Sequence, residues 1–118
     1  MYQTNNYGVM NLGEQTADIL FRTLADPTRR ALFERLCREG ELTVRVLTDQ
    51  AGVSQPAVSK HLGILKEAGL VSDRQDGRQC HYSAMPAALA PLVDWTTRMS
   101  GFWEKKFDDL EDLLRRMD

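Results

Sequence analysis

This sequence of 118 residues contains little cysteine. It also lacks long apolar runs and a basic leader segment. No apolar run approaches the roughly 20 residues that span a bilayer. The first residues lack the basic segment and apolar stretch of a secretory signal. Two cysteines, Cys37 and Cys80, are too few for a disulfide scaffold and favour a reducing intracellular compartment. We therefore expect a cytoplasmic protein with no membrane association.

Motifs of catalysis are also missing. The sequence has no Gly-rich phosphate loop, no nucleophile elbow, and no pair of histidines spaced with a carboxylate along a helix. We expect no enzyme activity and no cofactor. An apolar fraction of 42% and a charged fraction of 27% are typical of one folded domain. We assign residues 13–118 to that domain and expect the polar, Asn-rich residues 1–12 to form a mobile arm.

The net charge of −2 is unevenly distributed. Residues 26–83 contain nine lysines and arginines against eight acidic residues, whereas residues 84–118 contain five against seven. Any nucleic-acid surface must therefore be local and lie on the middle segment.

Cap residues and apolar spacing predict four helices in the first 70 residues. Asp26 before Pro27 marks a helix start, because Asp caps free N–H groups and Pro fits the first turn. Ser54 marks another start, and Gly52 in "AGVS" permits a tight turn between two helices. The expected helices are about residues 13–25, 27–40, 43–51 and 54–68.

An alternating segment, "LVSDRQ-DG-RQCHYS", follows these helices and predicts a hairpin that turns at Asp76-Gly77. A two-residue loop there places Gln75 opposite Arg78, Asp73 opposite Cys80, and Val71 opposite Tyr82. Alternation then directs one set of side chains inward. The inward set is Val71, Cys80 and Tyr82, and the outward set is Ser72, Arg74, Gln79 and His81.

The last segment, about residues 86–117, reads as one long helix with an interruption near Pro91. Its apolar stripe repeats about every 3.5 residues and is larger than one copy needs for its core. We expect it to pair with a second copy as a homodimer, with Trp95 and Phe102 folding back onto their own domain as the alternative. The predicted interface is Leu20, Leu24, Leu92, Trp95, Met99, Phe102 and Leu110.

The order of elements predicts a mainly α, winged helix-turn-helix fold: four helices, a β-hairpin wing and a long C-terminal dimerisation helix. On the fourth helix, Val58, Leu62 and Leu65 share the buried face, so the opposite face is free either to read DNA or to be an ordinary solvated surface. Two arginines flank the hairpin tip, where a wing meets the DNA backbone. The candidate DNA-binding residues are Ser54, Gln55, Pro56, Ser59, Lys60, His61, Arg74 and Arg78.

Three segments carry a family resemblance: "LADPTRRALFERL", "GELTVRVLTDQAGVSQPAVSKHLGILKEAGLV" and "RQDGRQCHYS". Together they resemble the ArsR/SmtB family of bacterial winged helix-turn-helix repressors, from about Leu20 to Ser83. The C-terminal "LVDWTTRMSGFWEKKFDDLEDLL" looks like the long terminal helix of a subgroup. The resemblance implies a homodimer joined through its first and last helices. It also implies an operator in double-stranded DNA, for which two-fold symmetry predicts an inverted repeat, and release by a metal ion or an oxidant.

The inducer is not evident from the residues. Thr43 and Arg45 stand near where the family's arsenic-type site needs thiolates, and the last helix has carboxylates but no histidine for a zinc-type site. We therefore predict no metal site. We expect Cys37 to be a small buried residue. Two alternatives stay open: a thiol-redox-responsive repressor, and a winged-helix protein-protein interaction module without DNA binding.

Overall fold

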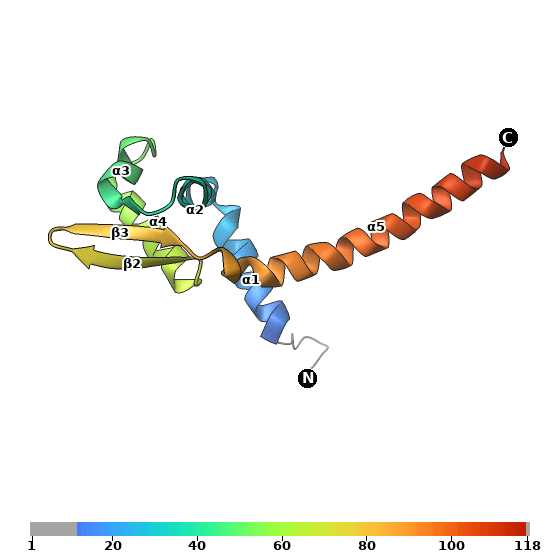
Figure 1. The fold of residues 1–118 in the computed structure, drawn as a ribbon, viewed down its shortest axis with the longest axis horizontal. Helices are drawn as coiled ribbons and strands as arrows, with labels where there is room; N and C mark the ends of the chain where they lie inside the picture. Colours follow the sequence, from blue (N-terminus) through green and yellow to red (C-terminus); the bar gives the residue numbers. More distant parts are fainter. Residues whose placement is uncertain (1–11, 118) are drawn as a thin grey trace.

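Short helices and one small sheet precede a long terminal helix in the computed structural model, which describes residues 12–117 apart from the side chains of Leu12 and Glu14 (Figure 1). The elements are α1 (Leu12–Ala25), α2 (Pro27–Glu39), β1 (Leu42–Thr43), α3 (Val44–Asp49), α4 (Gln55–Glu67), β2 (Val71–Asp76), β3 (Gln79–Ala84), the 3₁₀ helix η1 (Pro86–Leu89) and α5 (Ala90–Arg116). The predicted mainly α winged fold is confirmed. The predicted N-terminal arm lies outside the described residues, except that α1 begins at its last residue, Leu12.

The helix starts follow from side-chain caps, of which Asp26 and Ser54 were predicted above. The Asp26 carboxylate accepts the Arg29 backbone N–H at 3.0 Å, which holds the pKa of Asp26 below its usual range. The Thr43 hydroxyl accepts from the Val46 N–H at 3.2 Å and begins α3. The Ser54 hydroxyl likewise accepts from the Ala57 N–H at 3.3 Å and begins α4. Each cap satisfies a donor that the first helical turn would otherwise leave unpaired.

The sheet has three antiparallel strands in the order β1-β3-β2, and its β2–β3 hairpin forms the wing. The sequence did not reveal β1, which contributes only Leu42 and Thr43. The predicted register was wrong: Asp76 pairs with Gln79, and the loop is Gly77-Arg78, with Gly77 at φ 63°. Because the error is two residues, the side chains keep their predicted faces. Val71 and Tyr82 are buried on the inner face, as predicted.

One apolar core joins the helices to the inner face of the sheet. Leu36 from α2, Leu47 from α3 and Leu62 from α4 lie at its centre with 1% or less of their surface exposed. Leu70 and Val71 continue the core from the end of α4 into β2. Leu24 and Leu92 pack against its edge and join α1 to the start of α5. The core therefore fixes the position of α4 relative to the wing.

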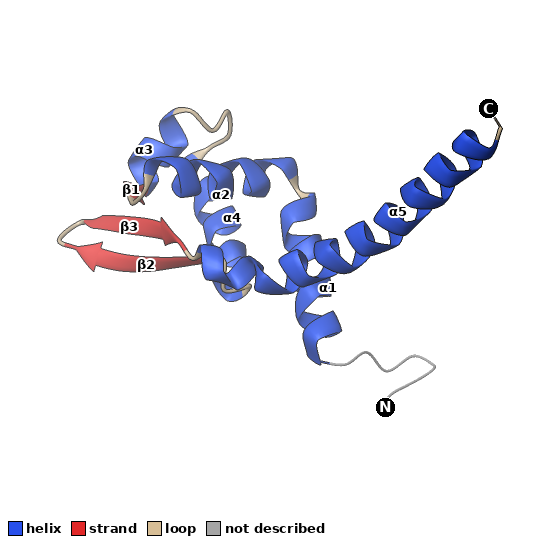
Figure 2. Cartoon of the chain, turned by 45° about the vertical axis from the view of Figure 1, so that its right-hand side comes forward, coloured by secondary structure: helices blue, strands red, loops and turns tan. Residues whose placement is uncertain are grey.

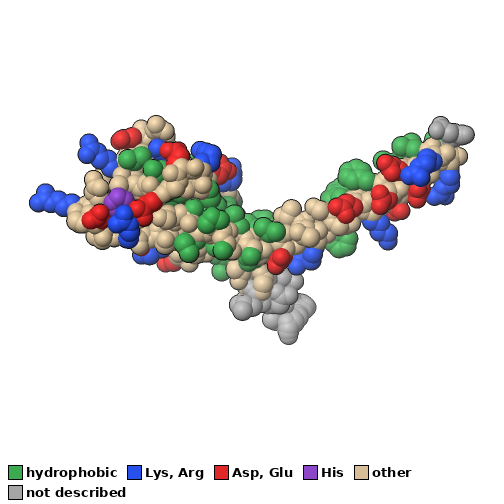
Figure 3. All heavy atoms as spheres, in the orientation of Figure 1, with side chains coloured by type: hydrophobic (Ala, Val, Ile, Leu, Met, Phe, Trp, Pro, Cys, Tyr) green, Lys and Arg blue, Asp and Glu red, His purple; other side chains and the backbone are tan. Residues whose placement is uncertain are grey.

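Helix α5 leaves this body soon after it begins (Figures 1 and 2). Phe21 of α1 meets Trp95 of α5 edge to face, with ring centroids 5.0 Å apart. From Ser100 to Met117 every residue is exposed, and apolar side chains alternate with charged ones along the helix (Figure 3). The chain consequently extends over 68 × 41 × 22 Å. Among residues 12–117, no helix is long and apolar enough to cross a membrane.

Candidate nucleic-acid interface

Helices α3 and α4 form the helix-turn-helix, and α4 presents one face to solvent. Gly52 adopts φ 73° in the connecting turn, a backbone angle that favours glycine. Val58, Leu62 and Leu65 are fully buried, which confirms the predicted inner face of α4. The opposite, exposed face of α4 is called here the reading face. It consists of Gln55, Pro56, Ser59, Lys60 and Gly63.

The reading face borders a shallow cavity of about 380 Å³. The start of α3, the front of α4 and the tip of the wing line it together. Three predicted site residues, Gln55, Ser59 and Arg78, meet there. The other five lining residues were not singled out for DNA contact in the sequence: Thr43, Val44, Arg45, Gln79 and Cys80. Arg45 lies in the first turn of α3, after the capping Thr43. This position beside a helix cap is the feature of the sequence that could have identified Arg45 as a site residue.

The two arginines of the wing have different surroundings. Arg78 lies in the hairpin loop, is exposed, and has no carboxylate within ion-pair distance among residues 12–117. Cationic side chains mark this free end of the wing in Figure 3. Arg74 instead donates two hydrogen bonds to the Glu41 carboxylate, at 3.0 and 2.7 Å. The Arg74 guanidinium thereby holds the pKa of Glu41 below its usual range.

Glu41 also contacts two residues of β3, Ser83 and His81. Its carboxylate accepts from the Ser83 hydroxyl at 3.2 Å and lies 3.7 Å from Nδ1 of His81. Arg74 also lies 3.7 Å from the Asp76 carboxylate. The charge of Arg74 is therefore largely balanced by Glu41 and Asp76, whereas Arg78 has no such partner among residues 12–117. Arg45, which lines the same cavity as Arg78, and Lys60 of the reading face are likewise exposed and without a carboxylate partner in the described part of the chain.

His61 faces inward rather than toward the reading face. It is half-buried, and Nη1 of Arg29 lies 3.4 Å from its Nδ1. Nε of Arg29 donates to the Thr23 carbonyl at 2.8 Å, so one arginine connects α1, α2 and α4. An arginine always donates, so Nδ1 of His61 accepts in this contact. His61, a candidate DNA-binding residue, therefore occupies the position of a packing residue with one side-chain contact.

The prediction for Cys37 was wrong. Its side chain is exposed on α2, because Leu36 and Phe33 already occupy the face of α2 that meets the core. Cys80 is half-buried, and its Sγ lies 3.9 Å from a carboxylate oxygen of Asp73. Both thiols are free. Within residues 12–117, no three histidine, cysteine or acidic side chains are close enough together to hold a metal ion.

The predicted dimer residues divide into three groups by exposure. Leu20 is 1% exposed and belongs to the core, so its prediction as an interface residue needs correction. Leu24, Leu92 and Met99 are partly buried. Trp95, Phe102 and Leu110 expose 39%, 63% and 49% of their surface. The exposed group continues along α5 through residues that were not chosen: Trp103, Phe107, Leu113, Leu114 and Met117.

A turn-linked helix pair followed by a β-hairpin defines a winged helix-turn-helix protein, a class that binds DNA. Residues 24–74 match the helix-turn-helix domain family. The transcriptional regulator Rv2034 of Mycobacterium tuberculosis is 40% identical over 100 residues, which cover 85% of this chain and 90% of the relative. A probable mercury resistance operon repressor of Streptomyces lividans is 47% identical over 73 residues, 62% of this chain but only 58% of that protein.

Solved structures agree with these relatives. The crystal structure of the ArsR family transcriptional regulator RHA00566 superimposes with a TM-score of 0.70 and 28% identity, over 77% of this chain and 93% of that one. The chain therefore belongs to the ArsR/SmtB family of DNA-binding transcriptional regulators.

Proposed function

We propose that this protein is a repressor that binds operator DNA through α4 and the wing. The observation that carries the proposal is the cavity in which Gln55 and Ser59 of α4 meet Arg78 of the wing. Three exposed cations, Arg45 and Arg78 at this cavity and Lys60 on the reading face, have no carboxylate partner among residues 12–117, although the protein as a whole is acidic. Local positive charge of this kind suits phosphate, whereas an interaction module without DNA binding has no need of it.

In this arrangement the front of α4 enters the major groove. The Gln55 amide and the Ser59 hydroxyl have both donor and acceptor atoms for base edges, and Gly63 allows a close approach of the backbone. Arg78 and Lys60 contact phosphates. Arg74, although predicted as a contact, is proposed to position the wing through Glu41 instead. His61 similarly supports α4 from behind through Arg29.

We further propose a homodimer formed through α5. Helix α5 has 27 residues, and all of its residues from Ser100 onward are exposed in the described part of the chain. Isolated helices are marginal in water, because most of their stability comes from the packing of an apolar face. The exposed stripe from Trp95 to Met117 supplies such a face. Ile19 and Phe21 of α1 are exposed by 50% and 42% and extend the surface, in place of the buried Leu20.

Two-fold symmetry gives the expected operator. Two copies of α4 related by such an axis fit an inverted repeat whose half-sites lie about 34 Å apart, one turn of DNA. We place the protein in the cytoplasm, where bacterial operators lie. Thr43 and Arg45 offer no soft metal ligand at the start of α3, so we propose that, unlike the mercury and arsenical resistance repressors among its relatives, this protein does not respond to those metals.

Binding to an operator selected from random-sequence DNA tests the proposal. Gln55→Ala removes a proposed base contact. It is expected to weaken the free energy of binding to the selected operator by about 1–3 kcal/mol and to relax the sequence preference at one base pair. Arg78→Ala is expected to weaken binding to all sequences alike and to reduce the salt slope by about 1. Arg98→Ala on α5 removes the same charge away from the interface and serves as the control. Parent-like affinity of both interface variants at fixed salt would contradict the assigned surface.

A further inference from the structure

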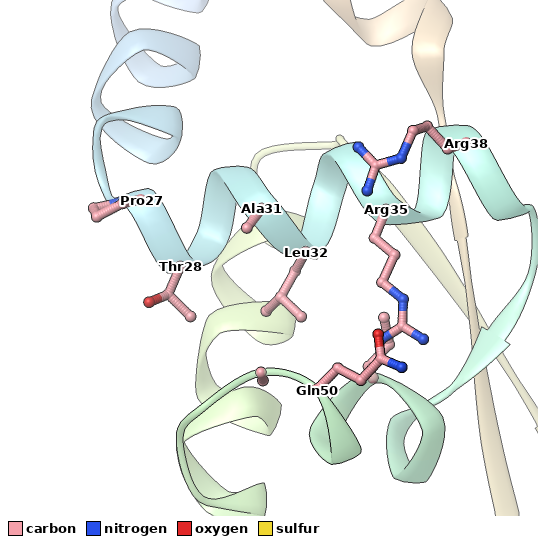
Figure 4. Close-up of a pocket in the computed structure, with 9 residues that line it drawn as sticks. Pro27, Thr28, Ala31, Leu32, Arg35, Arg38 and Gln50 are labelled. Carbon is pink, nitrogen blue, oxygen red and sulfur yellow. The ribbon is translucent and has the colours of Figure 1, made fainter.

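A second cavity lies on the other side of the helix-turn-helix, between α2 and the connection from α3 to α4 (Figure 4). Its volume is about 390 Å³, within the range of small-molecule sites. Leu32 and Leu47 form its apolar floor, and both are almost fully buried. Ala31 and Ala51 add small apolar walls. A ligand that fills this space therefore needs a hydrocarbon body.

Polar groups are concentrated at one end of this cavity. Arg35 and Arg38 of α2 and Gln50 at the end of α3 line that end, and Figure 4 shows Arg35 reaching from α2 toward Gln50. The Arg35 side chain is only 14% exposed; its Nε donates to Glu39 at 2.9 Å and its Nη1 to the Val46 carbonyl at 3.2 Å. Within residues 12–117, Arg38 has no carboxylate partner. One cation is balanced and the other is free, which leaves a net positive charge beside an apolar floor.

We propose that this cavity binds a small organic carboxylic acid. A carboxylate matches the planar donor fork of Arg38 in two parallel hydrogen bonds. The apolar body of the acid then covers Leu32 and Leu47, while the Thr28 hydroxyl at the other end can bond a polar substituent. Inorganic phosphate satisfies the cation but leaves the floor in contact with water. A neutral amide covers the floor but leaves Arg38 unpaired.

The position of the cavity gives the ligand a route to the reading face, a step that rests on the proposed function. Arg35 is the hydrogen-bonded link between α2 and the Val46 carbonyl of α3. Gln50 and Ala51 lie at the turn that leads into α4. A bound carboxylate attracts the donors of Arg35 away from Val46 and fills the space beneath this turn. The packing of α3 against α2 then changes, and this alters the orientation of α4 on DNA.

Titration of the full chain with benzoate, followed by the backbone amide signals of Ala31, Gln50 and Ala51, tests binding without DNA. We expect saturable shifts of these amides. Benzamide has the same shape without the charge, and inorganic phosphate has charge without the apolar body. Both are expected to bind at least about tenfold more weakly than benzoate, because benzamide lacks the charge that pairs with Arg38 and phosphate lacks the apolar body that covers the floor.

Arg38→Gln is the decisive variant, since Arg38 has no partner in the described chain and its loss leaves the fold intact. It is expected to weaken benzoate binding by about tenfold or more, whereas Arg98→Gln, which removes the same charge from α5, leaves it unchanged. The absence of saturable shifts, equal binding of benzamide, or an unchanged Arg38→Gln overturns the site. Because no DNA is present, benzoate binding by a protein that fails to bind DNA refutes only the proposed function. Operator binding without benzoate shifts refutes only this site.

Discussion

Replacement of Phe102 by glutamate is expected to dissociate the protein into monomers. Phe102 has 63% of its surface exposed on the apolar stripe of α5 and is not among the described residues that form the core or pack against it. A phenylalanine side chain offers about 200 Å², so about 125 Å² remains to be buried by a partner. At about 25 cal/mol per Å², that area corresponds to about 3 kcal/mol for each copy.

A two-fold interface contains this residue twice, so the upper limit of the loss is about 6 kcal/mol per dimer. The entropy lost when two copies associate and their side chains become ordered reduces the free energy expected from the buried area. Even half of the upper limit raises the dissociation constant of the dimer about 100-fold. The glutamate adds the desolvation of a charge, which acts in the same direction. The parent is therefore expected to sediment as a dimer at micromolar concentration and the variant as a monomer.

Thr97→Glu is the matched control. At 100° per residue Thr97 lies on the face of α5 opposite the apolar stripe, so the same charge is added to the same helix without touching the interface. Circular dichroism verifies that the folded domain persists in each variant. A monomeric parent, a dimeric Phe102→Glu protein with an unchanged spectrum, or equal dissociation by Thr97→Glu would refute the reasoning.

Three further outcomes are expected. Leu62→Ala removes a fully buried side chain of α4 and should lower the free energy of unfolding by about 2–5 kcal/mol in urea titrations; a loss below 1 kcal/mol, on the scale of an exposed site, would contradict the core position. Glu41 has a lowered pKa in the folded protein, so its contribution to stability is present above the unfolded pKa and is lost as the pH falls through the folded pKa. Melting temperatures of Glu41→Gln should accordingly fall less steeply than those of the parent between about pH 5 and pH 3, and parallel curves would count against the contact with Arg74. Zinc, cadmium or arsenite at low micromolar concentration should leave operator binding unchanged in an anisotropy assay, whereas release that Cys37→Ser or Cys80→Ser abolishes would reveal a thiol site.

Features fixed by local chemistry were predictable from the sequence. Asp26, Thr43 and Ser54 each precede a segment with helical spacing of apolar residues. Each caps its helix, because its side chain accepts a hydrogen bond from a free backbone N–H group of the first turn. The buried face of α4 followed from the spacing of Val58, Leu62 and Leu65. Each of these patterns depends on a few residues that are close together in the chain, so it can be recognised from a single sequence.

Features fixed by distant contacts were missed. Strand β1 has only two residues, too few for an alternation, and exists because β3 supplies its hydrogen-bond partners. The hairpin register was misplaced because Asp76-Gly77 is a strong turn signal, yet the structure places Asp76 in the ladder opposite Gln79. Nothing near Arg74 in the sequence indicates that Glu41, 33 positions away, takes its guanidinium. The same holds for Arg29 and His61, which come from two helices.

Thr43 belongs to two elements at once, and this affects how the protein opens locally. Its backbone pairs with His81 in the sheet, while its hydroxyl holds the first turn of α3 through the Val46 N–H. Separation of β1 from β3 therefore also releases the cap of α3. Hydrogen exchange is expected to report one shared opening free energy for the amides of β1, the facing part of β3 and the start of α3. The tip of the wing beyond that pairing is expected to exchange faster and independently, so that a rigid base presents a loop free to adapt to the surface it meets.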